Sequence, residues 1–225
     1  MKVFSTSAIK KCVFLVVLLF GQFACSRDSE SLDLVEITIG EIQETLLKRR
    51  VTCFEVVSAY LERIEKFDIP AGVNSISVIN SNALLRAREI DRAIAIDAPL
   101  PQLFCAPIVV KDNFDTHDMP TTGGSVILRD SYPLDDAFMV SQLRAAGAII
   151  IAKTNMAEWA FSPRQTVSST VGRTANVYDI SYVPAGSSGG TASAATASAS
   201  ARTEDTRQRF SSVPMPQLRS TASGE

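Results

Sequence analysis

Two short runs of apolar residues limit what this chain can fold into. They cover residues 107–110 and 148–152, and neither contains a polar side chain. Continuous apolar runs of this length are typical of strands that are buried on both faces of a sheet. Residues 135–146, between the two runs, have a helical pattern that ends at Gly147. Strand, helix and strand in this order predict a parallel α/β sheet with right-handed crossovers.

The remaining elements follow from hydrophobic periodicity and from helix-start patterns. Thr38 and Glu41, and again Thr52 and Glu55, have the spacing of a capping box. The pattern predicts helices over 39–49, 53–66 and 81–96 and a short strand over 76–79. Residues 191–201 are almost all Ala, Ser and Thr, which favours one further helix.

The first 26 residues have the pattern of an export signal. Lysines at positions 2, 10 and 11 precede an apolar run over 12–20, and small residues follow it. This run is too short to span a bilayer comfortably as a helix. Ordinary cleavage after Ser26 and cleavage after Ala24 with lipidation of Cys25 both remain open, and an uncleaved anchor is a third alternative. We therefore expect an exported protein, secreted or periplasmic and in the second case attached to a membrane, with a linker over 27–36.

Net charge and histidine content limit which nucleic-acid and metal partners the chain can have. The net charge of −2 gives no electrostatic argument for a nucleic-acid partner. His117 is the only histidine, which excludes a His-rich metal site, and we expect no metal.

Export would permit a disulfide between Cys53 and Cys105. Both residues lie in apolar stretches of sequence, however, and we expect two buried free thiols.

Lys111 stands where the first buried strand ends. Ligands of parallel α/β sheets bind outside the carboxyl ends of the strands. A lysine that is partly desolvated there can have a pKa low enough to act as a base. Considered alone, such a lysine is more often paired with a neighbouring carboxylate, here Asp112 or Asp115.

A glycine- and serine-rich segment over 186–190 is the second candidate for chemistry. It lies in a long stretch of Ser, Thr, Gly and Pro that begins at Ser162, and such loops are usually functional or disordered. The segment matches G-x-S-x-G, but His117 precedes it, so a triad in the chain order Ser, Asp, His is impossible. It also lacks the lysine of a phosphate-binding loop. A serine hydrolase without histidine can use a lysine as its base, which connects this segment with Lys111.

Several ordered blocks of the sequence resemble the amidase-signature family. The blocks are 37–43, 107–115, 119–125, 148–159 and 184–191, and together they extend over nearly all of residues 36–192. The resemblance implies an α/β fold with a mixed β-sheet flanked by helices, present over residues 37–200 as the N-terminal portion of the family domain. It also implies hydrolysis of small-molecule or peptide amides without a metal or a cofactor.

The resemblance further implies roles for individual residues. Lys111 is similar to the catalytic lysine, and Ser187 to the bridging serine, of a Ser–cis-Ser–Lys triad with a cis peptide bond between Gly186 and Ser187. The residues that would support this loop are Gly186, Ser188, Gly189 and Gly190. The residues that would line the substrate pocket are Met156, Thr121, Thr122 and Gly123.

The chain departs from the family after this point. Family members have a glycine-rich segment downstream of the bridging serine, which supplies the nucleophile and the oxyanion hole. Ser211 lies at a suitable distance, but no glycine occurs between Gly190 and Gly224, so a tight backbone nest around Ser211 is not expected and the nucleophile stays unassigned. The charged, aperiodic residues 201–225 are predicted to be an atypical, disordered tail. We expect a truncated, inactive amidase; the alternatives are a secreted non-catalytic binding module and a non-functional fragment.

Overall fold

The structure, a computed structural model, describes residues 33–34 and 37–200 of the chain. The export signal predicted over 1–26 and the tail predicted over 201–225, with Ser211, lie outside the described residues. Of the linker predicted over 27–36, only Asp33 and Leu34 are described, and Leu34 is buried. Within this described part, no helix has both the length and the apolar content that crossing a membrane requires.

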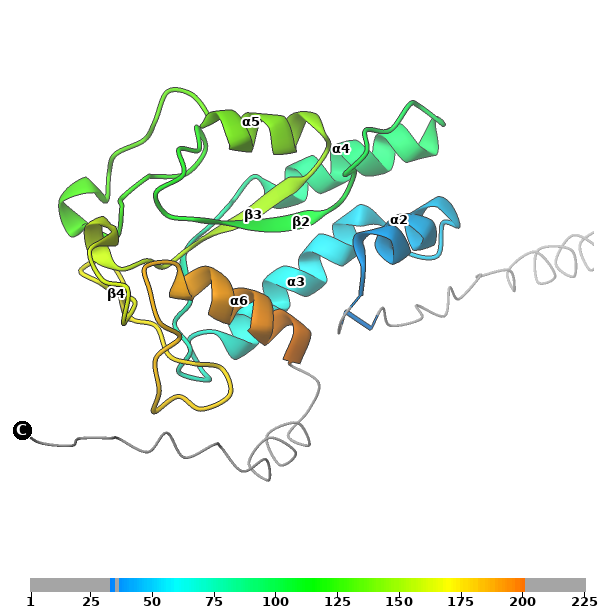
Figure 1. The fold of residues 1–225 in the computed structure, drawn as a ribbon. Helices are drawn as coiled ribbons and strands as arrows, with labels where there is room; N and C mark the ends of the chain where they lie inside the picture. Colours follow the sequence, from blue (N-terminus) through cyan, green and yellow to red (C-terminus); the bar gives the residue numbers. More distant parts are fainter. Residues whose placement is uncertain (1–32, 35–36, 201–225) are drawn as a thin grey trace, which may run out of the picture. The chain divides into compact units, whose positions relative to one another are not determined.

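Two capped helices open the described chain (Figure 1). Helix α2 spans Ile39–Leu47 and helix α3 spans Cys53–Phe67. In each helix the N-cap threonine, Thr38 or Thr52, accepts a hydrogen bond from the backbone N–H three residues on, and the glutamate at that position accepts one in return. These reciprocal bonds satisfy N–H groups that the start of a helix leaves unpaired. Both predicted capping boxes are therefore confirmed.

Three strands form the central sheet in the order β1–β3–β2. Strand β2 (Pro107–Lys111) runs parallel to β3 (Ile149–Thr154), whereas β1 (Ile76–Ile79) runs antiparallel to β3. The parallel pair predicted from the two apolar runs is confirmed, and β1 makes the sheet a mixed one. Among the described residues, no further strand pairs with the outer edge of β2.

Helices cover both faces of this sheet (Figure 1). Helix α5 (Phe138–Ala145) packs on one face, where Val140 and Ile150 belong to one buried apolar cluster. Helices α3, α4 (Ala83–Ala95) and α6 (Gly189–Ser200) pack on the other face around a second cluster. Every residue of β3 is buried between these layers, whereas most side chains of the edge strand β2 are only half-buried.

Most predicted helix ends differ from the observed ends by one or two residues, but α5 starts three residues later than predicted. The residues before Phe138 are engaged in a loop instead. The Asp136 carboxylate accepts a hydrogen bond from the backbone N–H of His117, and the N–H of Ala137 donates to the carbonyl of Asp115. These contacts tie residues 136 and 137 to the loop after β2, and the helix begins only after them.

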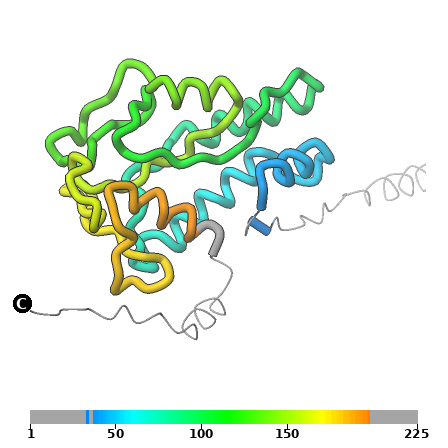
Figure 2. Tube along the Cα trace, viewed as in Figure 1, coloured from blue at the N-terminus to red at the C-terminus, as the bar shows by residue number. Residues whose placement is uncertain are grey.

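The segment rich in Ser, Thr and Gly contains a short hairpin of β4 (Val167–Ser168) and β5 (Gly172–Arg173). The side-chain amide of Asn155, just beyond β3, donates to the carbonyl of Gly172 and to the hydroxyl of Thr174, at 3.0 and 2.9 Å. Figure 2 shows the chain passing this hairpin and a further loop, drawn from yellow to orange, before it enters α6. The segment is therefore a folded loop that is tied to the end of β3.

Cys53 and Cys105 form a disulfide, so the expectation of two free thiols is wrong. Cys53 begins α3 and Cys105 precedes β2, and their Cα atoms lie 5.8 Å apart, a separation that a disulfide spans. Both residues are buried in the apolar cluster beneath the sheet. Apolar surroundings do not distinguish a buried thiol from a buried disulfide; the distance between the two residues does, and the fold sets that distance.

Candidate active site

The fold brings Lys111 and Ser187 into contact. Lys111 is the last residue of β2, and its Nζ donates a hydrogen bond of 2.7 Å to Ser187 Oγ. Both side chains are half-buried, and burial lowers the pKa of Lys111 below its usual value. A lower pKa makes the neutral amine easier to form, and a neutral amine beside a hydroxyl can accept its proton. The pair is therefore able to move a proton between the two side chains.

The loop that carries Ser187 is fixed by bonds to neighbouring segments. The peptide bond between Gly186 and Ser187 is cis, as the resemblance implies. The carbonyl of Ser187 accepts a hydrogen bond of 3.0 Å from the N–H of Ala157, which follows β3. The N–H of Gly189 donates to the hydroxyl of Thr166 at 3.0 Å. The loop is thus held from both the end of β3 and the start of the hairpin.

The glycines after Ser187 allow α6 to approach the end of β3 closely. Gly189 and Gly190 are buried, and a Cβ atom on Gly190 would lie 2.6 Å from the backbone N and 2.8 Å from the backbone C of Asn155. Ser188 is exposed, and its backbone carbonyl accepts a hydrogen bond from the N–H of Ala192. The two glycines therefore leave room for the backbone at the end of β3, and Ser188 contributes a backbone hydrogen bond to α6.

A second lysine, Lys153, lies on the opposite side of the sheet from Lys111. Lys111 pairs with Thr154 across the strands and Val110 pairs with Lys153, and successive residues of a strand face opposite sides. The hydroxyl of Thr154 lies 2.7 Å from that of Thr191 in α6. Lys111 therefore faces the α6 side, and Lys153 faces the α5 side.

Lys153 is fully buried and holds the loop that follows β2. Its Nζ donates to the carbonyls of Phe114 and Pro120, at 2.7 and 3.0 Å, and to the hydroxyl of Thr121 at 2.8 Å. Burial lowers the pKa of Lys153 to about 8, although Asp112 acts to raise it. No role was predicted for this residue from the sequence. The sequence feature that could have revealed it is that Lys153 directly follows the apolar run over 148–152.

The Asp112 carboxylate is engaged by Lys153 and by the same loop. Its Oδ1 lies 3.6 Å from Lys153 Nζ, while Oδ2 accepts from the hydroxyl of Thr122 and, at 3.1 Å, from the N–H of Gly124. Considered alone, Lys111 would more often be paired with such a neighbour. In the structure the carboxylate faces the other lysine, and Lys111 contacts Ser187.

The four residues predicted to line a substrate pocket lie on the loops after β2 and β3. Met156 and Thr122 are buried, whereas Thr121 and Gly123 are half-buried. The two loops are joined, because the N–H of Trp159 donates to the carbonyl of Gly123 at 2.9 Å. Trp159, for which no role of its own was predicted, is exposed on this joined surface.

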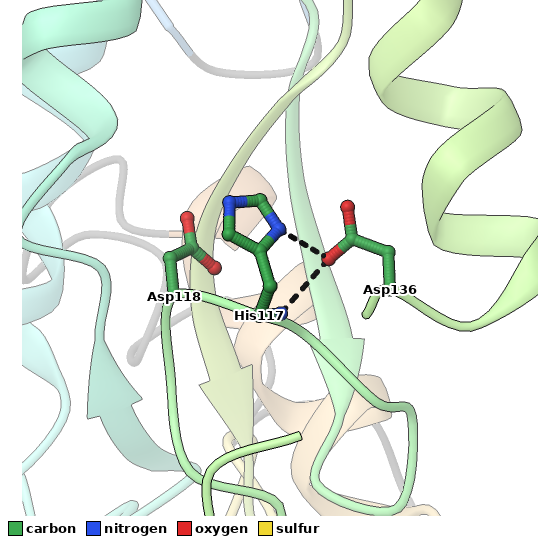
Figure 3. A group of neighbouring side chains, drawn as sticks. All are labelled: His117, Asp118 and Asp136. Atoms are coloured by element: carbon green, nitrogen blue, oxygen red, sulfur yellow. Dashed lines mark hydrogen bonds and ion pairs between the residues drawn. The ribbon is translucent and has the colours of Figure 1, made fainter. Parts of the chain in front are cut away.

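Figure 3 shows a separate polar group, in which the potential ligand atoms of His117, Asp118 and Asp136 lie within 4.8 Å of one another. Arg144 forms ion pairs with both carboxylates, at 2.7 Å to Asp118 Oδ1 and 3.0 Å to Asp136 Oδ2. The amide of Asn80 donates to the other oxygen of Asp118. His117 contacts the second oxygen of Asp136 through its backbone N–H and Nδ1. Protein groups therefore engage the oxygens that a cation would use, and the group ties the loop after β2 to the start of α5.

An apolar cavity of about 290 Å³ lies between α3, α6 and the sheet. Ile64, Val109 and Ala194 are among the residues that line it. Neither Lys111 nor Ser187 borders this cavity. It is therefore distinct from the pocket predicted beside that pair.

Comparison with known proteins identifies the family to which this chain belongs. The family model described as Amidase matches residues 55–202, and the chain belongs to this family. A glutamyl-tRNA(Gln) amidotransferase subunit from Acidothermus cellulolyticus is 41% identical over 165 residues, which cover 73% of this chain and 32% of that protein. The chain thus spans about a third of the length of the curated relatives it matches.

Solved structures of amidases also match this chain over about a third of their own length. The native peptide amidase from Stenotrophomonas maltophilia has a TM-score of 0.67 at 34% identity, over 71% of this chain and 34% of that chain. An amidase family protein from Bacillus anthracis has a TM-score of 0.64 at 35% identity, over 71% and 33% of the two chains. The observed mixed sheet with flanking helices is therefore part of the amidase-signature fold.

Proposed function

We infer that Lys111 and Ser187 form the proton-relay part of a site that hydrolyses carboxylic amides. The observation that carries this inference is the hydrogen bond of 2.7 Å from Lys111 Nζ to Ser187 Oγ, between residues 76 positions apart. Similarity to a peptide amidase supports an amide as the substrate, either a small molecule or a peptide.

The relay uses the two side chains described above together with a nucleophile, which stays unassigned. Neutral Lys111 takes a proton from the Ser187 hydroxyl, which in turn takes one from the attacking nucleophile. Return of the proton along the same path protonates the leaving nitrogen. The lowered pKa of Lys111 suits this role, because a base works best when its pKa lies near the working pH.

We extend the proposal to activity: these 225 residues alone do not turn over an amide. Acyl transfer needs a nucleophile and backbone N–H donors for the oxyanion. No glycine occurs between Gly190 and Gly224, so the sequence there does not favour the tight turn that would present such donors. Losing the nucleophile of such a triad costs several orders of magnitude in rate. The relay is then present without turnover.

We also propose that the protein is exported. The signal pattern over 1–26 supports it, and so does the Cys53–Cys105 disulfide, because disulfides persist in oxidising compartments and are rare in the cytosol. Lipidation at Cys25 would add attachment to a membrane. An exported protein does not meet aminoacyl-tRNA, which favours small-molecule or peptide amides over the tRNA-linked substrate named for the amidotransferase relatives.

A chimera tests the relay. Residues 37–192 replace the matching segment of the Stenotrophomonas peptide amidase, which is 34% identical and supplies the rest of the domain. We expect the chimera to hydrolyse a peptide amide and Lys111→Ala to lower kcat roughly 10³-fold or more. Lys48→Ala removes a lysine that is 53% exposed and directly follows α2, and this matched control should leave the rate unchanged.

Two results would contradict the proposal. The relay is wrong if the chimera with Lys111→Ala hydrolyses the amide as fast as the unaltered chimera. The inactivity of the 225-residue chain is wrong if that chain hydrolyses an amide and a fluorophosphonate labels one of its serines. A cooperative thermal melt without labelling, together with a chimera that does not respond to Lys111→Ala, would favour a non-catalytic binding module.

A further inference from the structure

Trp159 exposes an aromatic ring beside the segment that holds Ser187. It lies in the short 3₁₀ helix η2 (Glu158–Ala160), and 60% of the residue is exposed. Ala157, two positions earlier, donates the hydrogen bond to the Ser187 carbonyl. Because β2 and β3 are parallel, the segment after β3 and Lys111 at the end of β2 lie at the same edge of the sheet. This edge is on the left in Figure 1, where α6 also begins.

The backbone of Trp159 is in the left-handed region, with φ 54° and ψ 20°. Bulky residues rarely adopt this conformation, and it clusters at functional sites where the surroundings enforce it. Here the N–H of Trp159 is bound to the carbonyl of Gly123, and the N–H of Ala160 donates to the carbonyl of Ala157 at 2.8 Å. The ring lies against Gly123, since a Cβ atom there would be 3.9 Å from two carbons of the indole.

The residue before Trp159 fixes the same turn from another side. The carboxylate of Glu158 accepts a hydrogen bond of 2.9 Å from the N–H of Ser169, next to β4. The hydrogen bond with Ser169 lowers the pKa of Glu158, so this contact is made by the charged carboxylate. A ring held on a fixed turn loses little conformational entropy when a ligand packs on it.

We propose that the Trp159 ring is the surface on which the aromatic part of an amide substrate packs, which makes aromatic amides the preferred substrate class. The placement of the amide itself rests on the function proposed for Lys111 and Ser187. An indole and a second aromatic ring attract each other in offset-stacked or edge-to-face arrangements, beyond the burial of their surface. A small aliphatic amide has no ring to offer and gains little at this position.

Trp159 is the only tryptophan of the chain, so tryptophan fluorescence reports on this one ring. We expect titration of the 225-residue chain with benzamide to give a saturable change in tryptophan emission, and titration with acetamide to give none. No saturable change with benzamide, or an equal change with acetamide, overturns the proposal. The titration needs no turnover, so its failure is distinguishable from a failure of the proposed hydrolysis.

A variant pair then tests the residue itself. Trp159→Asn removes the ring and keeps a side chain that tolerates the left-handed conformation. We expect it to weaken benzamide binding about tenfold, measured by ligand-detected NMR, which needs no tryptophan. Phe161→Ala removes another exposed ring of the same loop, 91% exposed, and should change the affinity less than about twofold. Equal benzamide affinity of Trp159→Asn and the unaltered chain overturns the proposal.

Discussion

The Lys153 ammonium lies 3.6 Å from the Asp112 carboxylate, and both side chains are buried. Asp112 directly follows Lys111, so this ion pair is one residue away from the relay lysine and faces the other side of the sheet. Two buried charges are costly to desolvate, and their attraction offsets that cost only when further hydrogen bonds satisfy the remaining groups. Removing one partner leaves the other buried and uncompensated.

Lys153→Met should therefore destabilise the fold strongly. We expect a loss of about 3–5 kcal/mol in the free energy of unfolding, measured by urea denaturation. Lys48→Met, at the exposed lysine that directly follows α2, is the control and should change stability by less than about 0.5 kcal/mol. A loss for Lys153→Met no larger than that of the control would show that the buried pair adds nothing.

The same lysine makes stability depend on pH. Its pKa falls from 10.5 to about 8 on folding. Between these values the unfolded chain binds more protons than the folded chain, so the free energy of unfolding rises with pH across this window. The rise from this one group is about 3 kcal/mol in size, and it should be missing from Lys153→Met. A stability difference between the two proteins that stays constant over this window would contradict the assigned pKa.

Two glycines should respond to alanine in opposite directions. At Gly190 an added Cβ would overlap the backbone of Asn155, so Gly190→Ala should cost about 3 kcal/mol or more. At Gly40 in α2 the nearest atom would be 4.0 Å away, and Gly40→Ala should stabilise by about 0.5–1 kcal/mol through helix propensity. Urea denaturation measures both. Equal effects would mean that α6 and the end of β3 do not pack as described.

The disulfide should raise stability measurably. Reduction of the Cys53–Cys105 bond, which closes a sequence separation of 52, should cost about 2–4 kcal/mol and lower Tm. The double variant Cys53→Ala, Cys105→Ala is the control, since a reductant should not change its Tm. An unaltered chain whose Tm is the same with and without reductant would lack the bond.

Much of the fold could be predicted because its signals are local. The capping boxes at Thr38 and Thr52 fixed the starts of α2 and α3 within the sequence itself. The apolar runs predicted β2 and β3, and their parallel pairing followed from the intervening helix. Helix α5 was predicted too long because Asp136 bonds to His117, a contact between segments that no local pattern reveals.

Only part of the candidate site could be predicted from the sequence. The resemblance supplied the pairing of Lys111 with Ser187, and the structure places the two side chains in contact. The role of Lys153 depends on strand register, because one residue decides which face of the sheet a side chain occupies. The disulfide depends on how α3 packs beside the start of β2.

The strand order has a consequence for how the domain is made. Of the three strands that form the central sheet in the described part of the chain, β3 comes last in sequence and lies in the middle, so β1 and β2 are not neighbours. During synthesis from the N-terminus, neither of the first two strands has its sheet partner until residue 154 has left the ribosome. The Lys111–Ser187 contact must wait longer still, until the segment before α6 has emerged. Neither the central sheet nor the relay can therefore form before β3 has been made and lies between β1 and β2.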